Sequence, residues 1–119
     1  MKKRILVVDD DARLVFLIRE LLEAHGYEVI AAQDGEEAVE KTRRIKPDLV
    51  LLDVRMPKMD GDEVYMSLRA EPSTKHIPIL MLTGLRSEKE IAENKEENIL
   101  AKPVNLQVLL VKVKELAGS

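Results

Sequence analysis

The sequence predicts an α/β fold, in which a five-stranded parallel sheet is doubly wound, with helices on both faces. Short runs of β-branched and aliphatic residues alternate five times with longer amphipathic stretches, which is the pattern of strands joined by crossover helices. The chain has 119 residues, a length that one domain with one hydrophobic core usually has. We therefore expect a single domain over residues 1–119, with no output domain in this chain.

The expected strands are apolar runs of four or five residues without polar alternation. Such runs are typical of parallel strands that are covered by helices on both faces. The five expected strands are Ile5–Asp9, Glu28–Ala32, Leu49–Asp53, Ile79–Thr83 and Ile99–Ala101. Because parallel strands all run the same way, their carboxyl ends should share one rim of the sheet.

The amphipathic stretches that follow the strands predict five helices. They are Ala12–His25, Glu36–Ile45, Asp62–Ala70, Ser87–Asn94 and Asn105–Leu116. Apolar residues at helical spacing mark the faces that we expect to turn inward in the first two helices: Leu14, Leu17, Ile18, Leu21 and Leu22, then Ala38, Val39, Thr42 and Ile45. Gly26 is the expected C-terminal cap of the first helix, and Pro47 ends the second before the third strand.

The last helix carries more apolar residues than one buried face needs. We expect it to bury Leu106, Leu109, Val113 and Leu116, while Val108, Leu110 and Val111 add to the apolar surface. A wide contact with the core explains this excess, and so does a surface for a partner protein. Both explanations stay open.

Composition narrows the class of protein. The chain has no cysteine, so it has neither disulfides nor thiolate metal sites, which fits a reducing compartment. Its net charge of −3 comes from interspersed acids and bases, and 3% of its residues are aromatic, so direct nucleic-acid binding is not expected. The first apolar run is too short for a signal peptide or a membrane span. We expect a soluble cytoplasmic protein without membrane contact.

Acidic residues end two of the expected strands. Asp9 and Asp10 follow the apolar run of the first strand, and Asp53 follows that of the third. Crowded carboxylates repel one another, so such a cluster favours a hard cation that prefers oxygen ligands, namely Mg²⁺ or Mn²⁺. The alternative is that Asp9, Asp10 and Asp11 cap the following helix, since Asp is a favoured N-cap residue. One cap is enough for one helix, and no helix begins directly after Asp53.

Two further polar residues follow strands at the same rim. Thr83 ends the fourth expected strand, and Lys102 directly follows the fifth. In open parallel sheets, ligands bind beyond the carboxyl ends of the strands, where the strand order reverses. The rim therefore combines carboxylates, a hydroxyl and an ammonium group at the expected binding position.

A series of short motifs runs through almost the whole chain. They are Ile5–Asp10 (ILVVDD), Asp34-Gly35, Pro47–Asp53 (PDLVLLD), Met56-Pro57, Asp60-Gly61, Pro78–Gly84 (PILMLTG) and Lys102-Pro103. Singly they are weak, but together and in this order the chain from Lys3 to about Leu116 strongly resembles the receiver domain of bacterial two-component response regulators. The resemblance implies the strand order 2-1-3-4-5.

The resemblance also implies a phosphoryl-acceptor site. Asp53 would accept a phosphoryl group from a histidine kinase or a histidine phosphotransfer protein, and a carboxylate is an established nucleophile for this transfer. Mg²⁺ would be held by Asp10, Asp53 and the backbone carbonyl of Arg55, with Asp9 reaching it directly or through water. The chain would catalyse its own modification and its own slow dephosphorylation, without being a conventional enzyme.

Four residues of the later motifs would support this site. Lys102 would pair with a phosphoryl oxygen as a fixed positive charge, and a cis bond between Lys102 and Pro103 is usual in the family. Thr83 would turn its hydroxyl toward the phosphoryl group, and Gly84 would permit the close backbone approach that this motion needs. Alternatively, Thr83 is an ordinary β-branched strand residue and Lys102 an ordinary exposed lysine.

The chain departs from the family pattern near the output surface. Receivers commonly have an aromatic residue or histidine at the switch position, three residues before the lysine, where this chain has Ile99. The segment between Thr83 and Lys102 is also short. A downstream partner is expected at the face of the fourth and fifth helices. Arg55 and Leu85 are expected near the approach of water, and we hypothesise that they slow hydrolysis of the acyl phosphate. The alternative, that both side chains point to solvent, stays open.

Two other functions compete with the phosphorylation switch. Ile99 and the short fourth-helix region suggest a receiver-like scaffold that works without phosphorylation. A magnesium-dependent phosphatase of the haloacid dehalogenase type would also use an aspartate nucleophile, with Asp9 and Asp11 at the required spacing after the first strand. That family does not explain the motif around Asp53, and the chain lacks a cap insertion.

Overall fold

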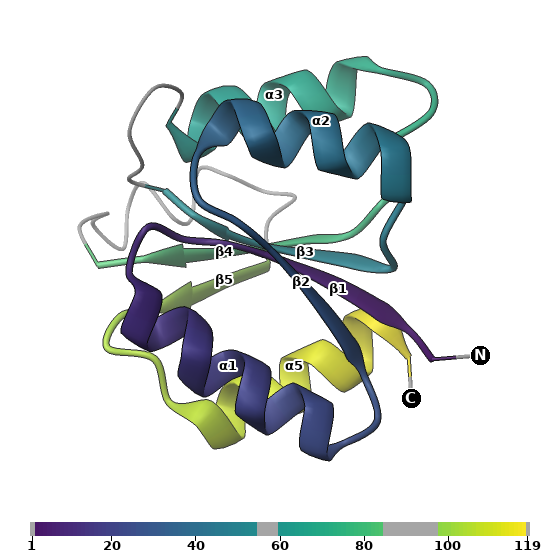
Figure 1. The fold of residues 1–119 in the computed structure, drawn as a ribbon. Coiled ribbons are helices and arrows are strands. Elements are labelled where there is room, and N and C mark those ends of the chain that lie inside the picture. The colour runs from purple at the N-terminus through teal and green to yellow at the C-terminus, as the bar shows by residue number, and fades with distance from the viewer. Residues whose placement is uncertain (1, 55–59, 85–97, 119) are drawn as a thin grey trace.

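The computed structural model describes residues 2–54, 60–84 and 98–118. Within them the strands are β1 (Arg4–Val8), β2 (Glu28–Ala32), β3 (Leu49–Asp53), β4 (Ile79–Thr83) and β5 (Asn98–Ala101). All pairings are parallel, and the order is β2-β1-β3-β4-β5 (Figure 1). The expected sheet and its strand order are therefore confirmed, with strand ends that differ from the predicted ones by one residue at most.

Helices cover both faces of the sheet. They are α1 (Ala12–Ala24), α2 (Gly35–Ile45), α3 (Gly61–Ala70) and α5 (Leu106–Ala117). Figure 1 shows α2 and α3 on one face and α1 and α5 on the other. The helix predicted at Ser87–Asn94 lies outside the described residues. None of the helices in the described ranges is long and apolar enough to cross a membrane.

The side chains of each central strand alternate between two hydrophobic cores. Ile5 and Val7 of β1 belong to the core with α1 and α5, whereas Leu6 and Val8 belong to the core with α2 and α3. Alternation follows from the pleat, which directs successive side chains to opposite faces. Because both faces are covered, the central strands are apolar throughout, as their sequences predict.

Asx residues fix where the helices begin. Each side chain accepts a hydrogen bond from a backbone N–H in the first turn, which is otherwise unpaired. The N-caps are Asp11, Asp34, Asp60 and Asn105. At the other end of α1, Gly26 has a φ of 88°, and the N–H of Tyr27 donates to the Leu22 carbonyl at 3.1 Å. This bond defines a Schellman motif, in which His25 is the C-cap residue and Gly26, expected as the cap, follows it in the left-handed conformation.

The inward face of two helices differs in detail from the expected one. Leu17 of α1 is 42% exposed, and its expected burial is wrong, because Ile18 and Leu22 form the centre of the face that meets the sheet. In α5, Leu109 and Val113 are buried as expected, and Ala117 joins them. Val108 and Val111 are exposed, so the apolar excess of α5 extends onto the surface.

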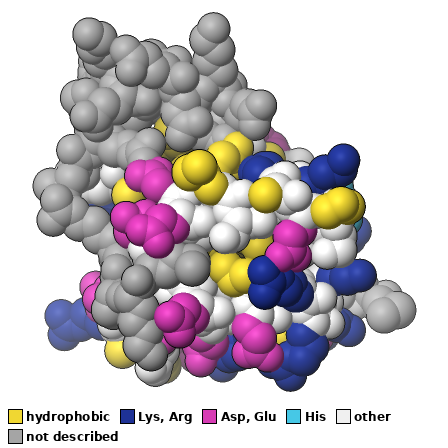
Figure 2. Space-filling model, turned by 90° about the horizontal axis from the view of Figure 1, so that it is seen from above, with side chains coloured by type: hydrophobic (Ala, Val, Ile, Leu, Met, Phe, Trp, Pro, Cys, Tyr) yellow, Lys and Arg dark blue, Asp and Glu magenta, His cyan; other side chains and the backbone are white. Residues whose placement is uncertain are grey.

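The outer surface over α2 and α3 is mixed in character. Viewed from above, acidic, basic and hydrophobic side chains are interspersed on this face (Figure 2). Met66 of α3 is one of the exposed hydrophobic residues. An ion pair between Arg43 and Glu71 joins the end of α2 to the end of α3. The burial that holds this layer therefore lies on the inner sides of the two helices, against the sheet.

Candidate functional site

Two acids meet because β1 and β3 are neighbours in the sheet. Val8 pairs with Leu52 in the parallel register, so the next residues along the two strands, Asp9 and Asp53, lie side by side at the carboxyl rim. Both are almost completely buried, with exposed fractions of 2% and 5%. The predicted convergence of these carboxylates follows directly from strand order and register.

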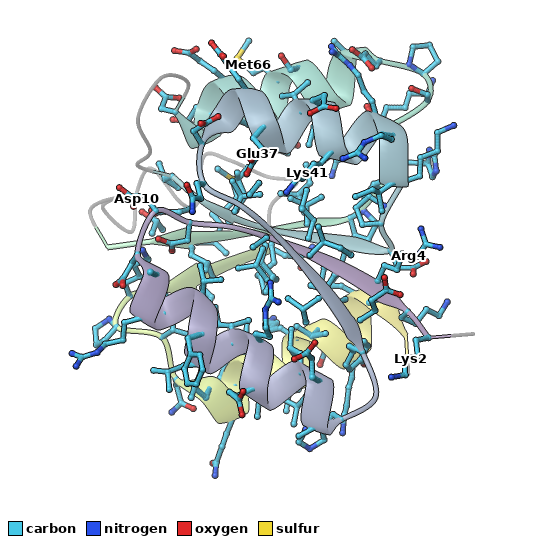
Figure 3. The ribbon with its side chains drawn as sticks, viewed as in Figure 1. Lys2, Arg4, Asp10, Glu37, Lys41 and Met66 are labelled. Carbon is cyan, nitrogen blue, oxygen red and sulfur yellow. The ribbon has the colours of Figure 1, made fainter. Side chains whose placement is uncertain are left out.

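Asp10 completes a cluster of three carboxylates. Oxygen atoms of Asp9, Asp10 and Asp53 all lie within 4.8 Å of one another. Asp10 is exposed, at the turn between β1 and α1, where Figure 3 shows it at the rim of the sheet. The cluster is therefore buried on the side of Asp9 and Asp53 and open on the side of Asp10.

Lys102 reaches two of the three acids. Its Nζ lies 3.1 Å from Oδ2 of Asp9 and 3.3 Å from Oδ1 of Asp53. Burial lowers the pKa of Lys102, but the hydrogen bond and charge of Asp9, followed by the charge and hydrogen bond of Asp53, outweigh it, so the pKa is raised. The ammonium is consequently a permanent positive charge at neutral pH. An ordinary exposed lysine would not be held between two buried carboxylates.

The three consecutive aspartates after β1 have different roles. Asp11 caps α1, accepting from the N–H groups of Arg13 and Leu14 at 3.1 and 3.3 Å. Oδ1 of Asp9 accepts from the N–H of Asp11 at 2.9 Å, which orients the buried carboxylate. Capping therefore explains Asp11 but neither Asp9 nor Asp10. It also removes support from the phosphatase reading, which needs Asp9 and Asp11 as a pair in the site.

The donor set fits a hard divalent cation. Three carboxylates and one ammonium give the cluster a formal charge of −2, which a divalent cation would balance. All available ligand atoms are oxygens, the ligands that Mg²⁺ and Mn²⁺ prefer. The open side at Asp10 leaves room for water ligands, which Mg²⁺ usually retains.

The ends of β4 and β5 meet beside Lys102. The backbone N–H of Lys102 donates to the Thr83 carbonyl at 2.9 Å, and the Lys102-Pro103 bond is cis, as expected. Thr83 is buried at the same rim. A Cβ placed on Gly84 would lie 3.5 Å from Cβ of Lys102, an ordinary van der Waals contact, so this conformation does not itself require glycine there. The role of Gly84 in a motion stays a prediction.

Gly61 has a structural role that the sequence did not suggest. A Cβ at this position would lie 2.5 Å from the backbone oxygen of Asp53 and 2.6 Å from Cα of Val54. The N–H of Gly61 also donates to the Val54 carbonyl at 2.8 Å. The first turn of α3 is thus pressed against the backbone that carries Asp53. The motif Asp60-Gly61 was visible in the sequence, but nothing local indicated this contact.

A hollow beside Lys102 was also not predicted. It has a volume of about 290 Å³. Its lining residues are Asp11, Arg13, Leu14, Leu17, Lys102, Pro103 and Val104. The hollow lies between the start of α1 and the loop after β5. Leu17, which was expected to be buried, is one of its exposed lining residues.

Some predicted site residues cannot be placed. Arg55 and Leu85, which we expect to slow hydrolysis, lie outside the described residues. The same is therefore true of the backbone carbonyl of Arg55, the fourth proposed metal ligand. Ile99 is half-buried and packs against the core formed with α2 and α3. The effect of Ile99 on switching stays a prediction.

Comparison with known proteins agrees with this geometry. A family model described as the response regulator receiver domain matches residues 5–114. The chain is 51% identical over 88 residues to the alkaline phosphatase synthesis transcriptional regulatory protein PhoP of Bacillus subtilis, covering 74% of this chain and 36% of PhoP. It therefore spans about a third of that relative.

Two solved structures share the whole fold. The chemotaxis response regulator CheY4 of Vibrio cholerae superposes with a TM-score of 0.89 at 34% identity, covering 98% of this chain and 99% of CheY4. The receiver domain of the sensor histidine kinase PA1611 from Pseudomonas aeruginosa gives a TM-score of 0.87 at 30% identity, with complete coverage of both chains. The latter structure is described with a magnesium ion coordinated in its active site cleft.

Proposed function

We propose that this chain, which belongs to the family of response regulator receiver domains, accepts a phosphoryl group on the carboxylate of Asp53. Receiver domains serve phosphorylation-controlled two-component signalling, and they are not conventional enzymes. The donor is a phosphohistidine of a histidine kinase or a histidine phosphotransfer protein. An Asp53 oxygen bonds to phosphorus as the phosphorus–nitrogen bond breaks, and the leaving imidazole takes up a proton.

The observation that carries this proposal is the meeting of three carboxylates and one ammonium at the carboxyl rim. Among the acids, Asp9 is poorly suited as a nucleophile, because Oδ1 accepts from the N–H of Asp11 and Oδ2 from Lys102. Asp10 is exposed, where water competes for its carboxylate. Asp53 ends the central strand β3 and is almost completely buried, with Lys102 close enough to pair with a group added to it.

We propose Mg²⁺ as the cofactor, with Mn²⁺ as a substitute of similar chemistry. Asp9, Asp10 and Asp53 would hold it, together with the backbone carbonyl of Arg55, and the formal charge of the cluster supports this assignment. When bound, the cation reduces repulsion between the Asp53 carboxylate and an incoming phosphoryl group. The magnesium described in the related receiver domain of PA1611 supports the same choice.

Lys102 and Thr83 would hold the phosphoryl group once it is attached. Lys102 is already protonated and oriented, so it stabilises added negative charge without a change in its own protonation state. Thr83 lies at the end of the neighbouring strand, with its backbone tied to that of Lys102. Movement of its hydroxyl toward the phosphoryl group, with Gly84 as the adjoining hinge, would pass the change to the following loop.

The signal would leave through the side of the molecule that carries α5. Val108 and Val111 are exposed there, at 42% and 55%, which supports a downstream protein partner on the face of the fourth and fifth helices. The other half of that face lies outside the described residues. Partner choice would then depend on the phosphorylation state of Asp53.

Intact mass spectrometry tests the acceptor. The parent chain, incubated with Mg²⁺ and acetyl phosphate, should gain one phosphoryl group, and removal of Mg²⁺ with a chelator should abolish the gain. Asp53→Asn should not be modified, because the amide is not a nucleophile for this transfer. If a folded parent chain gains no mass, the scaffold without phosphorylation becomes the better explanation.

Asp11→Asn is the matched control. Asn is about as good an N-cap as Asp, so this variant keeps α1 and removes a negative charge close to the site. It should gain the phosphoryl group as the parent does. If Asp53→Asn is still modified and Asp11→Asn is not, Asp53 is not the acceptor, and a nucleophile just after β1 becomes the better explanation.

A further inference from the structure

The outer edge of β2 is the feature from which we draw a further inference. β2 is the first strand in the order β2-β1-β3-β4-β5, so among the described strands it pairs with β1 alone, on one of its sides. The N–H of Glu28 donates to the Lys3 carbonyl, and the carbonyl of Ala32 accepts from Asp9. Backbone groups alternate sides along a strand. Those of Ala31 and Gln33 therefore point away from β1, toward the free edge.

Two side chains of α2 bind this edge. Nζ of Lys41 donates to the Ala31 carbonyl at 2.6 Å, and Oε1 of Glu37 accepts from the N–H of Gln33 at 2.8 Å. The same two side chains form an ion pair at 3.7 Å, one helical turn apart. Figure 3 shows both projecting from α2 toward the sheet. Each bond joins a charged group to the backbone, which makes it stronger than a neutral hydrogen bond.

The two side-chain hydrogen bonds reproduce those that one residue of a neighbouring parallel strand would make. In a parallel ladder, a residue opposite Ala32 would donate its N–H to the carbonyl before Ala32 and accept from the N–H after it. Those two groups are the Ala31 carbonyl and the Gln33 N–H. Lys41 takes the place of the donor, and Glu37 takes the place of the acceptor.

Helix capping does not account for the contact of Glu37. In a capping box, a Glu at the third helical position accepts from the N–H of the N-cap residue itself. The N-cap here is Asp34, whose side chain accepts from the N–H of Glu37. Glu37 bonds one residue earlier, at Gln33 on the strand side. Its position in the helix is that of a capping box, but its partner belongs to the edge of the sheet.

We propose that the Glu37–Lys41 pair closes the free edge of β2, and that breaking the pair opens this edge to β2 of a second copy of the chain. Strand edges with unpaired backbone groups pair with other strands, and a charged lysine on the edge is a common protection. β2 contains Val29 and Ile30, two β-branched residues of the kind that favours strand pairing. A two-fold axis would place two such edges antiparallel, with the same groups exposed on each.

Lys41→Met tests the proposal, with Arg44→Met as its matched control. Met keeps much of the apolar stem of either residue, and each variant removes one positive charge from α2. Arg44 pairs with Glu40 at 3.6 Å, also one turn apart, but both side chains are more than half exposed. In sedimentation velocity over a concentration series, the average molar mass of Lys41→Met should rise toward twice that of the monomer. At the same concentrations, the parent and Arg44→Met should keep the monomer mass. Coincident curves for the two variants would overturn the proposal.

Amide exchange locates the association. In Lys41→Met, exchange at the Ala31 amide should slow as the concentration rises, because that N–H faces the free edge and would enter the new ladder. Association without this protection would use another surface and would contradict the proposal. Far-UV circular dichroism verifies that both variants are folded.

Amide exchange at Gln33 tests, in the monomer, whether Glu37 protects the edge of β2. This experiment still tests the proposal if Lys41→Met does not fold. Glu37→Ala should speed exchange of the Gln33 amide about tenfold, as expected for loss of a hydrogen bond to a charged group. Glu40→Ala, on the same helix, should leave that amide unchanged. Equal exchange in the two variants would show that Glu37 does not protect the edge. Neither experiment depends on phosphorylation of Asp53.

Discussion

β1 carries an ion pair at each end, and the two pairs lie in different surroundings. At the amino end, Arg4 faces Glu28 of β2 at 3.9 Å, with side chains that are 43% and 55% exposed. At the carboxyl end, Lys102 faces Asp9 at 3.1 Å, and the Asp9 side chain is fully buried. Figure 3 shows the opposite rims, marked by Arg4 and Asp10. The same strand thus holds a solvated pair and a desolvated one.

The difference shows what makes one rim chemically competent. Water screens the charges of Arg4 and Glu28, so their attraction is weak and either charge is stable alone. Asp9 has no such screening, and its buried carboxylate is contacted instead by Lys102 and by the N–H of Asp11. The buried carboxylates at this rim favour nearby positive charge, which is the property that the proposed metal ion and phosphoryl group would use.

The largest expected effect comes from breaking each pair in turn. Lys102→Met should lower the free energy of unfolding by about 3 kcal/mol in the absence of divalent cations, because it leaves Asp9 charged and buried. Arg4→Met should cost about 0.5 kcal/mol or less. Urea denaturation of both variants measures the difference. Lys102→Met should also lose most of its phosphorylation by acetyl phosphate, whereas Arg4→Met should keep it.

If the two variants lose similar unfolding free energies, burial does not make the Lys102–Asp9 pair more important for stability than the Arg4–Glu28 pair. The comparison is fair because each substitution removes one positive charge next to β1. A chelator in the urea titrations of both variants excludes rescue of Lys102→Met by a metal ion at the three carboxylates.

A second expected effect concerns how tightly the backbone packs at the carboxyl rim. Gly61→Ala should cost about 2 kcal/mol, because the new Cβ meets the backbone of Asp53 and Val54 at 2.5 and 2.6 Å. Gly84→Ala is the matched control at the same rim, and its Cβ would make an ordinary contact at 3.5 Å. Its stability should change by about 0.5 kcal/mol or less. Thermal unfolding of the two variants measures both.

Equal stabilities for Gly61→Ala and Gly84→Ala would mean that α3 can move away from Asp53 at no cost. The Gly84 variant has a further use, since a folded protein with slow phosphorylation would support a role of that glycine in motion.

Local patterns were enough to predict the fold and the central part of the site. The apolar runs predicted the strands, and the acids after β1 and β3 converge because parallel strands end at one rim. Strand order came from the family resemblance, since no local signal fixes which strands are neighbours. The contacts that were missed all join distant elements. Gly61 meets the Asp53 backbone only because of how α3 sits against β3.

The edge of β2 illustrates the same limit. Glu37 and Lys41 are visible in the sequence as an ordinary pair one turn apart, and nothing local relates them to Ala31 and Gln33. Their contacts depend on β2 being the outer strand and on α2 crossing back over it. The exposure of Leu17 has a similar cause, because helical spacing gives an apolar stripe but not its centre.

The smallest expected effect is a pH dependence that separates the two ends of β1. The raised pKa of Lys102 means that its contribution to stability is complete below the unfolded value of about 10.5 and is lost as pH rises through the higher folded value. The stability difference between the parent and Lys102→Met should therefore shrink above about pH 10.5, by at most about 1.4 kcal/mol per pH unit for one proton. Arginine stays protonated throughout this range, so the difference between the parent and Arg4→Met should stay flat. Urea denaturation from pH 9 to about pH 11 measures both differences, and subtracting each variant removes the titration of the remaining lysines and tyrosines. A difference for Lys102 that stays constant across this window would mean that the ammonium is not what stabilises buried Asp9.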